Sequence, residues 1–161
     1  MKFECEASDV SFIDRAPLQF INVADLKASP SAVFASLSDT DQWLRWFPDM
    51  KSAAWEGEPG LGVRRTVKVG AMVIKEHFMV WNEPDQMAFY VVETSLPFAK
   101  CLVENYTIEE TSTGSRFTYA VGIQPRFPLS LLKFAAKPIL EKMFRDATAS
   151  FERYVNQELS A

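Results

Sequence analysis

The sequence predicts an α+β fold in which one curved antiparallel sheet covers a long C-terminal helix. Residues 128–159 carry apolar side chains at steps of three and four, which indicates a helix roughly 45 Å long with one apolar face. Residues 51–124 read as strands separated by short turns, and short connections are typical of an antiparallel meander. Because a helix of that length cannot cover its own apolar face, we expect the sheet to cover it.

The composition is that of a globular protein. A chain of 161 residues that is 48% hydrophobic is long enough for one domain with a real core, so residues 1–161 are expected to form a single domain. The net charge of −4 predicts no basic surface for nucleic acid. The sequence contains no apolar run of bilayer length, no signal peptide and only two cysteines, so we expect a cytoplasmic protein.

The single histidine, His77, limits the chemistry of the site. A histidine metal cluster or a Ser-His-Asp triad would depend on this residue alone, so we expect no metal and no cofactor. The strand pattern places His77 at a surface or sheet edge. Cys101 has no partner that would activate its thiol, and we interpret it as inert.

The N-terminal part of the chain predicts one strand. Residues 1–16 are mixed and polar, and we expect an irregular lead-in there, or an extra edge strand around residues 10–12. Residues 18–26 alternate between two sets of side chains, which predicts the first main strand, partly buried on both faces.

Two short helices follow this strand. Ser29 fits an N-cap and Pro30 the first helical position, so a helix is expected to begin there. Residues 38–41 break it and cap a second short helix, which Pro48 ends. The predicted order is therefore one strand, two helices, six strands and one helix.

Two turns predict the register of the sheet. Gly70-Ala71 as a two-residue turn pairs Arg65 with Glu76, and residues 111–114 as a four-residue loop place Glu104 opposite Val121. Directly opposed residues share a face. The same registers gather apolar and aromatic side chains on one inner face: Val63, Val67, Val69, Phe78, Tyr106, Ile108, Phe117, Tyr119, Val121 and Ile123.

Three charged residues, Arg65, Glu76 and Glu104, fall on this inner face. A buried charge is costly unless it is paired, and Arg65 opposite Glu76 is a natural pair. Glu104 needs a further donor, such as Tyr119, Arg65 or water. A satisfied polar pair or a strand end in solvent would explain these charges structurally. The functional alternative is a polar spot in an apolar cavity, which would orient one end of a hydrophobic ligand.

Several stretches resemble the polyketide cyclase/dehydrase and lipid-transport family of the START-like (SRPBCC) superfamily. The residues that carry the resemblance are Ser29–Phe34, Leu37–Asp39, Trp43–Pro48, Gly60–Arg65, Glu76 and Gly114–Tyr119, followed by the terminal helix. The resemblance covers residues 18–158 and implies a helix-grip fold: a seven-strand antiparallel sheet wrapped around the C-terminal helix, with a cavity between them. It implies lipid, sterol, quinone, polyketide or hormone ligands and, in some members, cyclisation or dehydration, but no shared catalytic motif.

The first hypothesis is a protein that binds or transports a small hydrophobic or amphipathic ligand. The mouth of its cavity is expected where residues 96–98 meet residues 127–129. The candidate ligand-binding residues are Arg65, Val67, Glu76, Phe78, Phe89, Val91, Phe98, Glu104, Tyr106, Phe117, Tyr119, Leu132, Ala136, Leu140 and Met143.

The start of the terminal helix is unusual in this hypothesis. Residues 127–137 are apolar nearly all round and carry lysines, so they either make transient contact with a membrane surface or close over a ligand. Pro138 removes a helical hydrogen bond, and a kink there would let residues 129–137 move as a lid.

The second hypothesis is an enzyme such as a cyclase or dehydratase. Glu76 and Glu104 would act as acid and base, Arg65 would stabilise an oxyanion, and Tyr106 or Tyr119 would donate a proton. The sequence contains no tight catalytic motif that would select this alternative.

The third hypothesis is a protein-interaction module or a homodimer. Met79, Trp81, Tyr90 and Val92 would all point outward in the expected register, and together they would form an apolar patch on the convex face of the sheet. Trp43 and Trp46, in contrast, are expected to pack the core beside the small helices.

Overall fold

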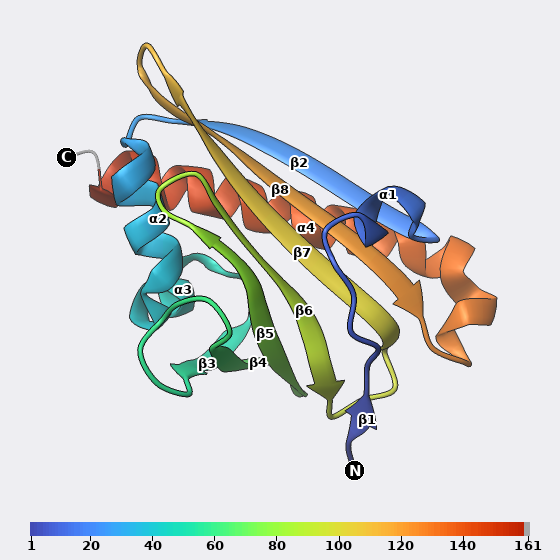
Figure 1. Cartoon of the computed structure of the whole chain (residues 1–161). Helices are drawn as coiled ribbons and strands as arrows, with labels where there is room; N and C mark the ends of the chain where they lie inside the picture. Colours follow the sequence, from blue (N-terminus) through green and yellow to red (C-terminus); the bar gives the residue numbers. More distant parts are fainter. Residues whose placement is uncertain (160–161) are drawn as a thin grey trace.

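The structure, a computed structural model that describes residues 1–159, is an α+β fold built on one antiparallel sheet (Figure 1). The strands are β1 (Phe3–Glu4), β2 (Leu18–Leu26), β3 (Met50–Trp55), β4 (Arg64–Val69), β5 (Met72–Asn82), β6 (Gln86–Thr94), β7 (Ala99–Thr111) and β8 (Gly114–Pro125). Their spatial order is β2-β8-β7-β6-β5-β4-β3, and β1 pairs with β6. The predicted helix-grip arrangement of a sheet around a terminal helix is confirmed.

The helices lie on both faces of this sheet. They are α1 (Phe12–Arg15), α2 (Pro30–Ser38), α3 (Thr40–Trp46), the 3-10 turn η1 (Leu129–Leu132), α4 (Lys133–Tyr154) and the π-helical turn η2 (Val155–Leu159). Figure 1 shows α4 running along the inner face of the sheet, whereas α1 lies on the opposite face. Within residues 1–159, no helix combines the length and the apolar character needed to cross a bilayer.

The residues at the start of the chain differ from the expected lead-in. The strand expected around residues 10–12 is wrong, because Phe12 begins α1 and the extra strand lies earlier, at Phe3–Glu4. The neighbours Phe12 and Ile13 are both buried in a small second core with Cys101 and Val103. A strand sends neighbouring side chains to opposite faces, so only a helical turn can bury both on one side.

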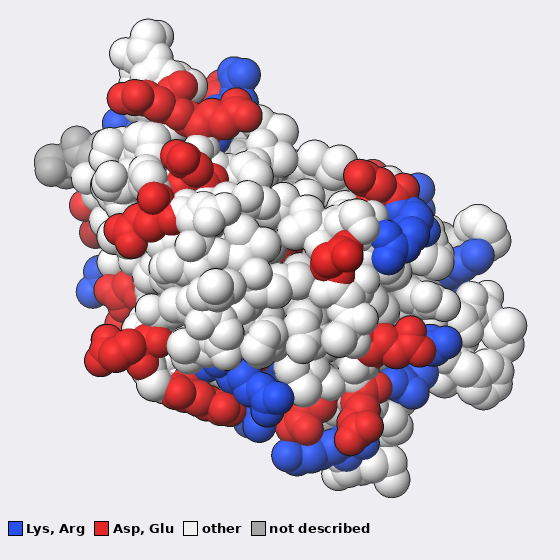
Figure 2. Space-filling model, in the orientation of Figure 1, with Lys and Arg blue, Asp and Glu red and all other residues white. Residues whose placement is uncertain are grey.

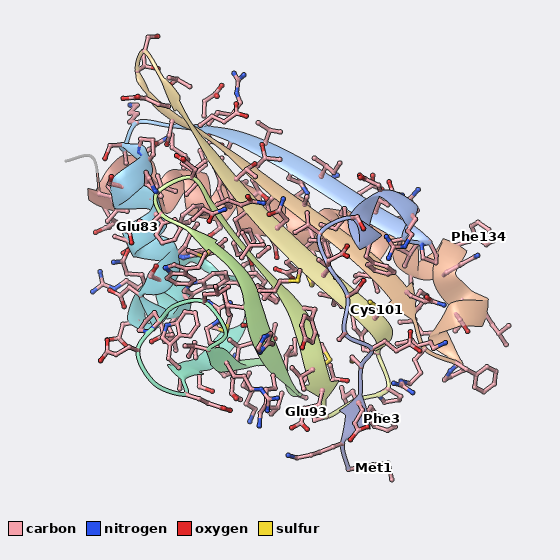
Figure 3. The ribbon with its side chains drawn as sticks, viewed as in Figure 1. Met1, Phe3, Glu83, Glu93, Cys101 and Phe134 are labelled. Carbon is pink, nitrogen blue, oxygen red and sulfur yellow. The ribbon has the colours of Figure 1, made fainter. Side chains whose placement is uncertain are left out.

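Gly122 of β8 lets α1 approach the sheet closely. A Cβ atom at this position would lie 2.8 Å from the Cα atom of Ile13, so a larger residue would push α1 away. Cys101 is buried in the same second core, and Figure 3 labels it on β7, beside the segment that joins β1 to α1. Burial raises the pKa of its thiol to about 11. The thiol is therefore protonated at neutral pH.

Both predicted registers are confirmed. Arg65 pairs with Glu76 between β4 and β5, and Glu104 pairs with Val121 between β7 and β8. The expected four-residue loop is tighter than predicted, because Thr111 pairs with Gly114 and leaves a two-residue turn. The register is unchanged by this, since the same residues remain opposite one another.

A register shift in β5 moves one predicted surface residue inward. The shift lies between Phe78 and Val80, and after it Trp81 contacts Phe34 and Trp55 on the inner side. The expected outward position of Trp81 is therefore wrong, because an irregularity in the strand reverses the alternation of side chains. Met79 and Tyr90 do lie on the other face, where they pack against the second core rather than form an open patch.

The burial of side chains in the C-terminal helix changes at about residue 140. Beyond that point, Leu140, Phe144, Ala147, Thr148 and Phe151 are buried. They pack against the inner face of the sheet: the Phe144 ring lies 5.2 Å from Phe20, and the Phe151 ring 5.0 Å from Phe117. Before that point, the apolar side chains of η1 and the first turns of α4 are mostly exposed. Pro138 lies inside α4, as the sequence indicates.

Candidate functional site

Four strands of the sheet, β4 and β5 on one side of β6 and β7 and β8 on the other, bring the polar residues of the inner face together. Arg65 comes from β4, Glu76 from β5, Glu104 and Tyr106 from β7, and Tyr119 from β8. Alternation along each strand turns all five side chains toward the same side of the sheet, where the main apolar core lies. The inner face therefore contains one polar cluster within an aromatic surround.

Arg65 and Glu76 form a buried ion pair. The Arg65 Nε atom donates a hydrogen bond of 2.6 Å to Glu76 Oε2, and Arg65 is only 1% exposed. Its guanidinium carbon lies 4.3 Å from the centre of the Trp43 ring and 5.1 Å from that of Phe78. These cation–π contacts offset part of the cost of burying the charge. Burial raises the pKa of Glu76, and the Arg65 charge opposes that rise.

One Arg65 nitrogen has no partner in this arrangement. Within the described residues, Nη1 is buried and makes no hydrogen bond to the protein. Arginine donates through several N–H groups in a fixed planar fork, and a buried donor without an acceptor is costly. The Arg65 guanidinium can therefore donate at least one more hydrogen bond, from Nη1, while it stays paired with Glu76.

Glu104 is held by hydroxyl groups instead of a cation. Its Oε2 atom accepts hydrogen bonds from the Tyr106 hydroxyl, at 2.5 Å, and from the Tyr119 hydroxyl, at 2.9 Å. Both tyrosines are 1% exposed, whereas Glu104 itself is half-buried. Burial raises the pKa of Glu104 to about 7, although the Tyr106 hydrogen bond acts in the opposite direction.

The tyrosines act as fixed donors to this carboxyl. Burial, followed by the nearby Glu104 charge, raises the pKa of both hydroxyl groups well above 10. They remain protonated over the whole range in which Glu104 titrates. Near neutral pH the Glu104 carboxyl therefore changes between an acceptor and a donor, while its two neighbours keep the same role.

The structure brings most of the expected site residues to this inner face, but not all. Buried in the core with the polar cluster are Val67, Phe78, Phe89, Val91, Tyr106, Phe117, Tyr119 and Leu140. Phe98, Ala136 and Met143 are half-buried and pack against its edge. Leu132 is 59% exposed and lies outside the cluster, because it belongs to η1 and not to the packed part of α4.

An apolar groove lies at the place where the mouth is expected. It has a volume of about 430 Å³ and lies between the β4–β5 turn, the β6–β7 loop and η1. The residues that line it are Val69, Ala71, Met72, Leu96, Pro97, Phe98, Pro128 and Leu129. The structure thus brings residues 96–98 and 128–129 together.

Trp43 has a role that the sequence does not reveal. Trp43 and Trp46 pack in the core, as predicted, but Trp43 also covers the Arg65 guanidinium, with Trp55 on the same cation at 5.4 Å. Helix α3 brings Trp43 there from a distant part of the chain. No regular spacing of residues along the chain indicates which strand residue a short helix will contact. The sequence therefore predicts that the tryptophans are buried, but not that Trp43 contacts Arg65.

Comparisons with known proteins agree with this architecture. A family model described as polyketide cyclase / dehydrase and lipid transport matches residues 19–156. An uncharacterized protein of Mycobacterium tuberculosis is 29% identical over 162 residues, which cover 99% of this chain and 97% of the relative.

Solved structures show the same fold at low identity. A START superfamily protein from Mycobacterium smegmatis matches with a TM-score of 0.69 and 13% identity, covering 86% of this chain and 97% of that one. The di-domain ARO/CYC StfQ from the steffimycin biosynthetic pathway matches with a TM-score of 0.70 and 8% identity, covering 89% of this chain and 52% of that one. At these identities the likeness concerns the fold alone.

Proposed function

The chain belongs to the polyketide cyclase / dehydrase and lipid transport family, and from this premise we propose that it binds a small apolar molecule with one polar end. The proposed site lies between the inner face of the sheet and α4, with the apolar part of the ligand against the aromatic side chains. The polar end of the ligand is proposed to meet Glu104.

Glu104 is the observation that carries this proposal. It is half-buried, its Oε2 atom is already engaged by Tyr106 and Tyr119, and its other oxygen accepts no hydrogen bond within the described residues. Binding sites for small molecules are mostly apolar, with a few polar groups that fix the orientation of the ligand. A carboxyl held in place by two buried hydroxyl groups is suited to that task.

The Arg65–Glu76 pair offers the same site a second polar contact for the ligand. Its charges are compensated, and the buried Arg65 Nη1 atom retains an unused donor. A ligand oxygen that reached both Glu104 and this donor would be oriented by two groups from different strands. The apolar groove at residues 96–98 and 128–129 is the proposed route by which the ligand enters.

Two probes of the same apolar shape test the polar contact. 2-Naphthol and naphthalene differ by one hydroxyl group, and we expect the protein to bind 2-naphthol about tenfold more tightly, the value of one buried hydrogen bond. NMR titration of labelled methyl groups measures both affinities and locates the probe. We expect shifts at Val67, Val91 and Ile108, which share the inner core.

A pair of variants assigns the preference to one carboxyl. The Glu104→Leu variant should bind 2-naphthol and naphthalene with similar affinity. The Glu110→Leu variant, changed at an exposed position on the same strand, should still prefer 2-naphthol. Equal binding of the two probes by the unaltered protein would contradict the proposal. So would methyl shifts confined to Val103 and its neighbours under α1.

A second candidate function is acid–base catalysis in the same place. A pKa of about 7 lets Glu104 both accept and donate a proton near neutral pH, and Tyr106 or Tyr119 is a second proton donor. One structural neighbour, StfQ, is itself described as an ARO/CYC protein of a biosynthetic pathway. Exchange of the α-hydrogens of propiophenone in D₂O tests this candidate. Catalysis predicts acceleration that rises through pH 7 and disappears in Glu104→Gln; binding alone predicts none.

A further inference from the structure

The start of the C-terminal helix presents a concentrated apolar surface to solvent. Five large side chains here, Phe127, Leu131, Leu132, Phe134 and Ile139, are between 59% and 83% exposed. They make up five of the twelve exposed large hydrophobic side chains in the described part of the chain, although they fall within thirteen residues. We name this surface, together with Lys133 and Lys137, the apolar tip.

The apolar tip projects from the end of the molecule. Figure 3 shows Phe134 at the far end of α4, pointing away from the sheet. Beyond residue 140 the outward side of the same helix is polar, with Glu141, Lys142, Arg145 and Asp146. The exposed apolar side chains are therefore a property of the first turns and not of the helix as a whole.

The charge of the apolar tip has the opposite sign from that of the whole chain. Between residues 127 and 140 the sequence contains Lys133 and Lys137 and no acidic residue, whereas the chain carries a net charge of −4. In Figure 2, the end of the molecule where η1 and α4 begin is mostly uncharged surface beside basic side chains. Lys133 also lies over the Phe134 ring, with its Nζ atom 5.4 Å from the ring centre.

From this combination we propose that the apolar tip docks on a lipid bilayer that contains anionic headgroups. Exposed leucines and phenylalanines insert into the boundary between headgroups and acyl chains, and lysines beside them bind anionic lipids. A second copy of the chain fits less well, because a two-fold contact through this surface would bring lysines of like charge together.

The position of the apolar tip connects docking with the groove. Pro128 and Leu129 line the groove, and Leu96 on its other side is also exposed. Docking would place the open side of the groove against the bilayer, where an apolar ligand can leave or enter without crossing water. This exchange step rests on the proposed function, whereas docking itself does not.

Sedimentation with lipid vesicles tests docking without any added ligand. We expect the protein to bind vesicles of phosphatidylcholine with 30% phosphatidylglycerol at least tenfold more tightly than vesicles of phosphatidylcholine alone. Leu131→Ser/Phe134→Ser should weaken this binding at least tenfold, and Lys133→Glu/Lys137→Glu should remove the preference for anionic vesicles.

A matched control uses exposed apolar residues elsewhere. Ile21 and Val23 of β2 are 62% and 56% exposed, and Ile21→Ser/Val23→Ser should bind vesicles like the unaltered protein. The Leu131→Ser/Phe134→Ser variant should also keep its affinity for 2-naphthol, which separates docking from the ligand site. Equal vesicle binding by the tip and control variants would overturn the proposal. A concentration-dependent dimer abolished by Leu131→Ser/Phe134→Ser, with no vesicle binding, would likewise overturn it and assign the surface to a second copy.

Discussion

Two glutamates on the same inner face have contrasting surroundings. Glu76 accepts a hydrogen bond from the Arg65 guanidinium, whereas Glu104 accepts two from the uncharged hydroxyl groups of Tyr106 and Tyr119. Glu76 is 4% exposed, and Glu104 is half-buried. One carboxylate is therefore paired directly with an opposite charge, whereas the other makes its hydrogen bonds to uncharged hydroxyl groups.

This difference gives the two glutamates different roles: Glu76 is part of a fixed ion pair, whereas Glu104 can gain or lose a proton. A cation at 2.6 Å can balance a buried carboxylate, so the Arg65–Glu76 pair holds β4 and β5 together with its charges in place. Hydroxyl donors offset only part of the desolvation cost, and Glu104 can reduce the remainder by binding a proton. The comparison leads to predictions about stability, pH and hydrogen bonding.

The largest expected effect comes from breaking the ion pair. Glu76→Gln leaves the Arg65 guanidinium buried without an opposite charge beside it, which should lower the free energy of unfolding by about 3–5 kcal/mol. Urea denaturation at pH 7.5 measures this loss. Asp25→Asn is the matched control, because Asp25 and Arg116 are also cross-strand partners, 2.9 Å apart, but both are exposed. Equal losses in the two variants would show that burial does not distinguish the pairs.

The second effect is a dependence of stability on pH that Glu104 controls. Its folded pKa of about 7 lies above the ordinary value of 4.5, so the folded state binds the proton more tightly than the unfolded state. Below pH 4.5 the Glu104 carboxyl is protonated in both the folded and the unfolded state, so its shifted pKa does not lower the free energy of unfolding there. Stability then falls as pH rises, until above pH 7 about 3 kcal/mol has been lost.

Glu104→Gln should remove this part of the pH dependence. Urea denaturation of both proteins between pH 4.5 and pH 8 measures it, and we expect the difference in unfolding free energy to change by about 2–3 kcal/mol across that range. Parallel profiles for the two proteins would mean that Glu104 has the same proton affinity in the folded and unfolded states.

A smaller effect is expected from each tyrosine hydroxyl. Tyr119→Phe removes one hydrogen bond to the Glu104 carboxylate, so the pKa of Glu104 should rise further and stability at pH 8 should fall by about 1–2 kcal/mol. NMR titration of the Glu104 carboxyl carbon gives the pKa directly. Tyr154→Phe, whose hydroxyl donates to Gln42 instead, should leave that pKa unchanged.

The sequence predicts the ion pair because the evidence for it is local. The two-residue turn at Gly70-Ala71 determines which residues of β4 and β5 face each other, and Arg65 opposite Glu76 follows by counting. For Glu104 the sequence leaves three donors open, Tyr119, Arg65 or water, and the structure shows a hydrogen bond from Tyr119 on the neighbouring strand β8. The second donor, Tyr106, lies two residues from Glu104 on the same strand.

The features that the sequence does not predict depend on tertiary contacts. Trp43 reaches Arg65 only because α3 packs against the sheet, and α1 is held by its approach to Gly122. The register shift between Phe78 and Val80 is not indicated by any local pattern in the sequence, and so the predicted direction of Trp81 is wrong. Turn geometry can be read along the chain, whereas packing between distant elements cannot.

The placement of the tryptophans gives the protein a built-in optical reporter. All four, Trp43, Trp46, Trp55 and Trp81, make ring contacts on the inner side of the sheet. Trp43 and Trp55 share the Arg65 cation, and the Trp43 ring lies 6.2 Å from that of Tyr106. Trp43 and Trp46 are buried and Trp55 and Trp81 half-buried, so intrinsic fluorescence reports on the inner side of the sheet beside the polar cluster without an added dye.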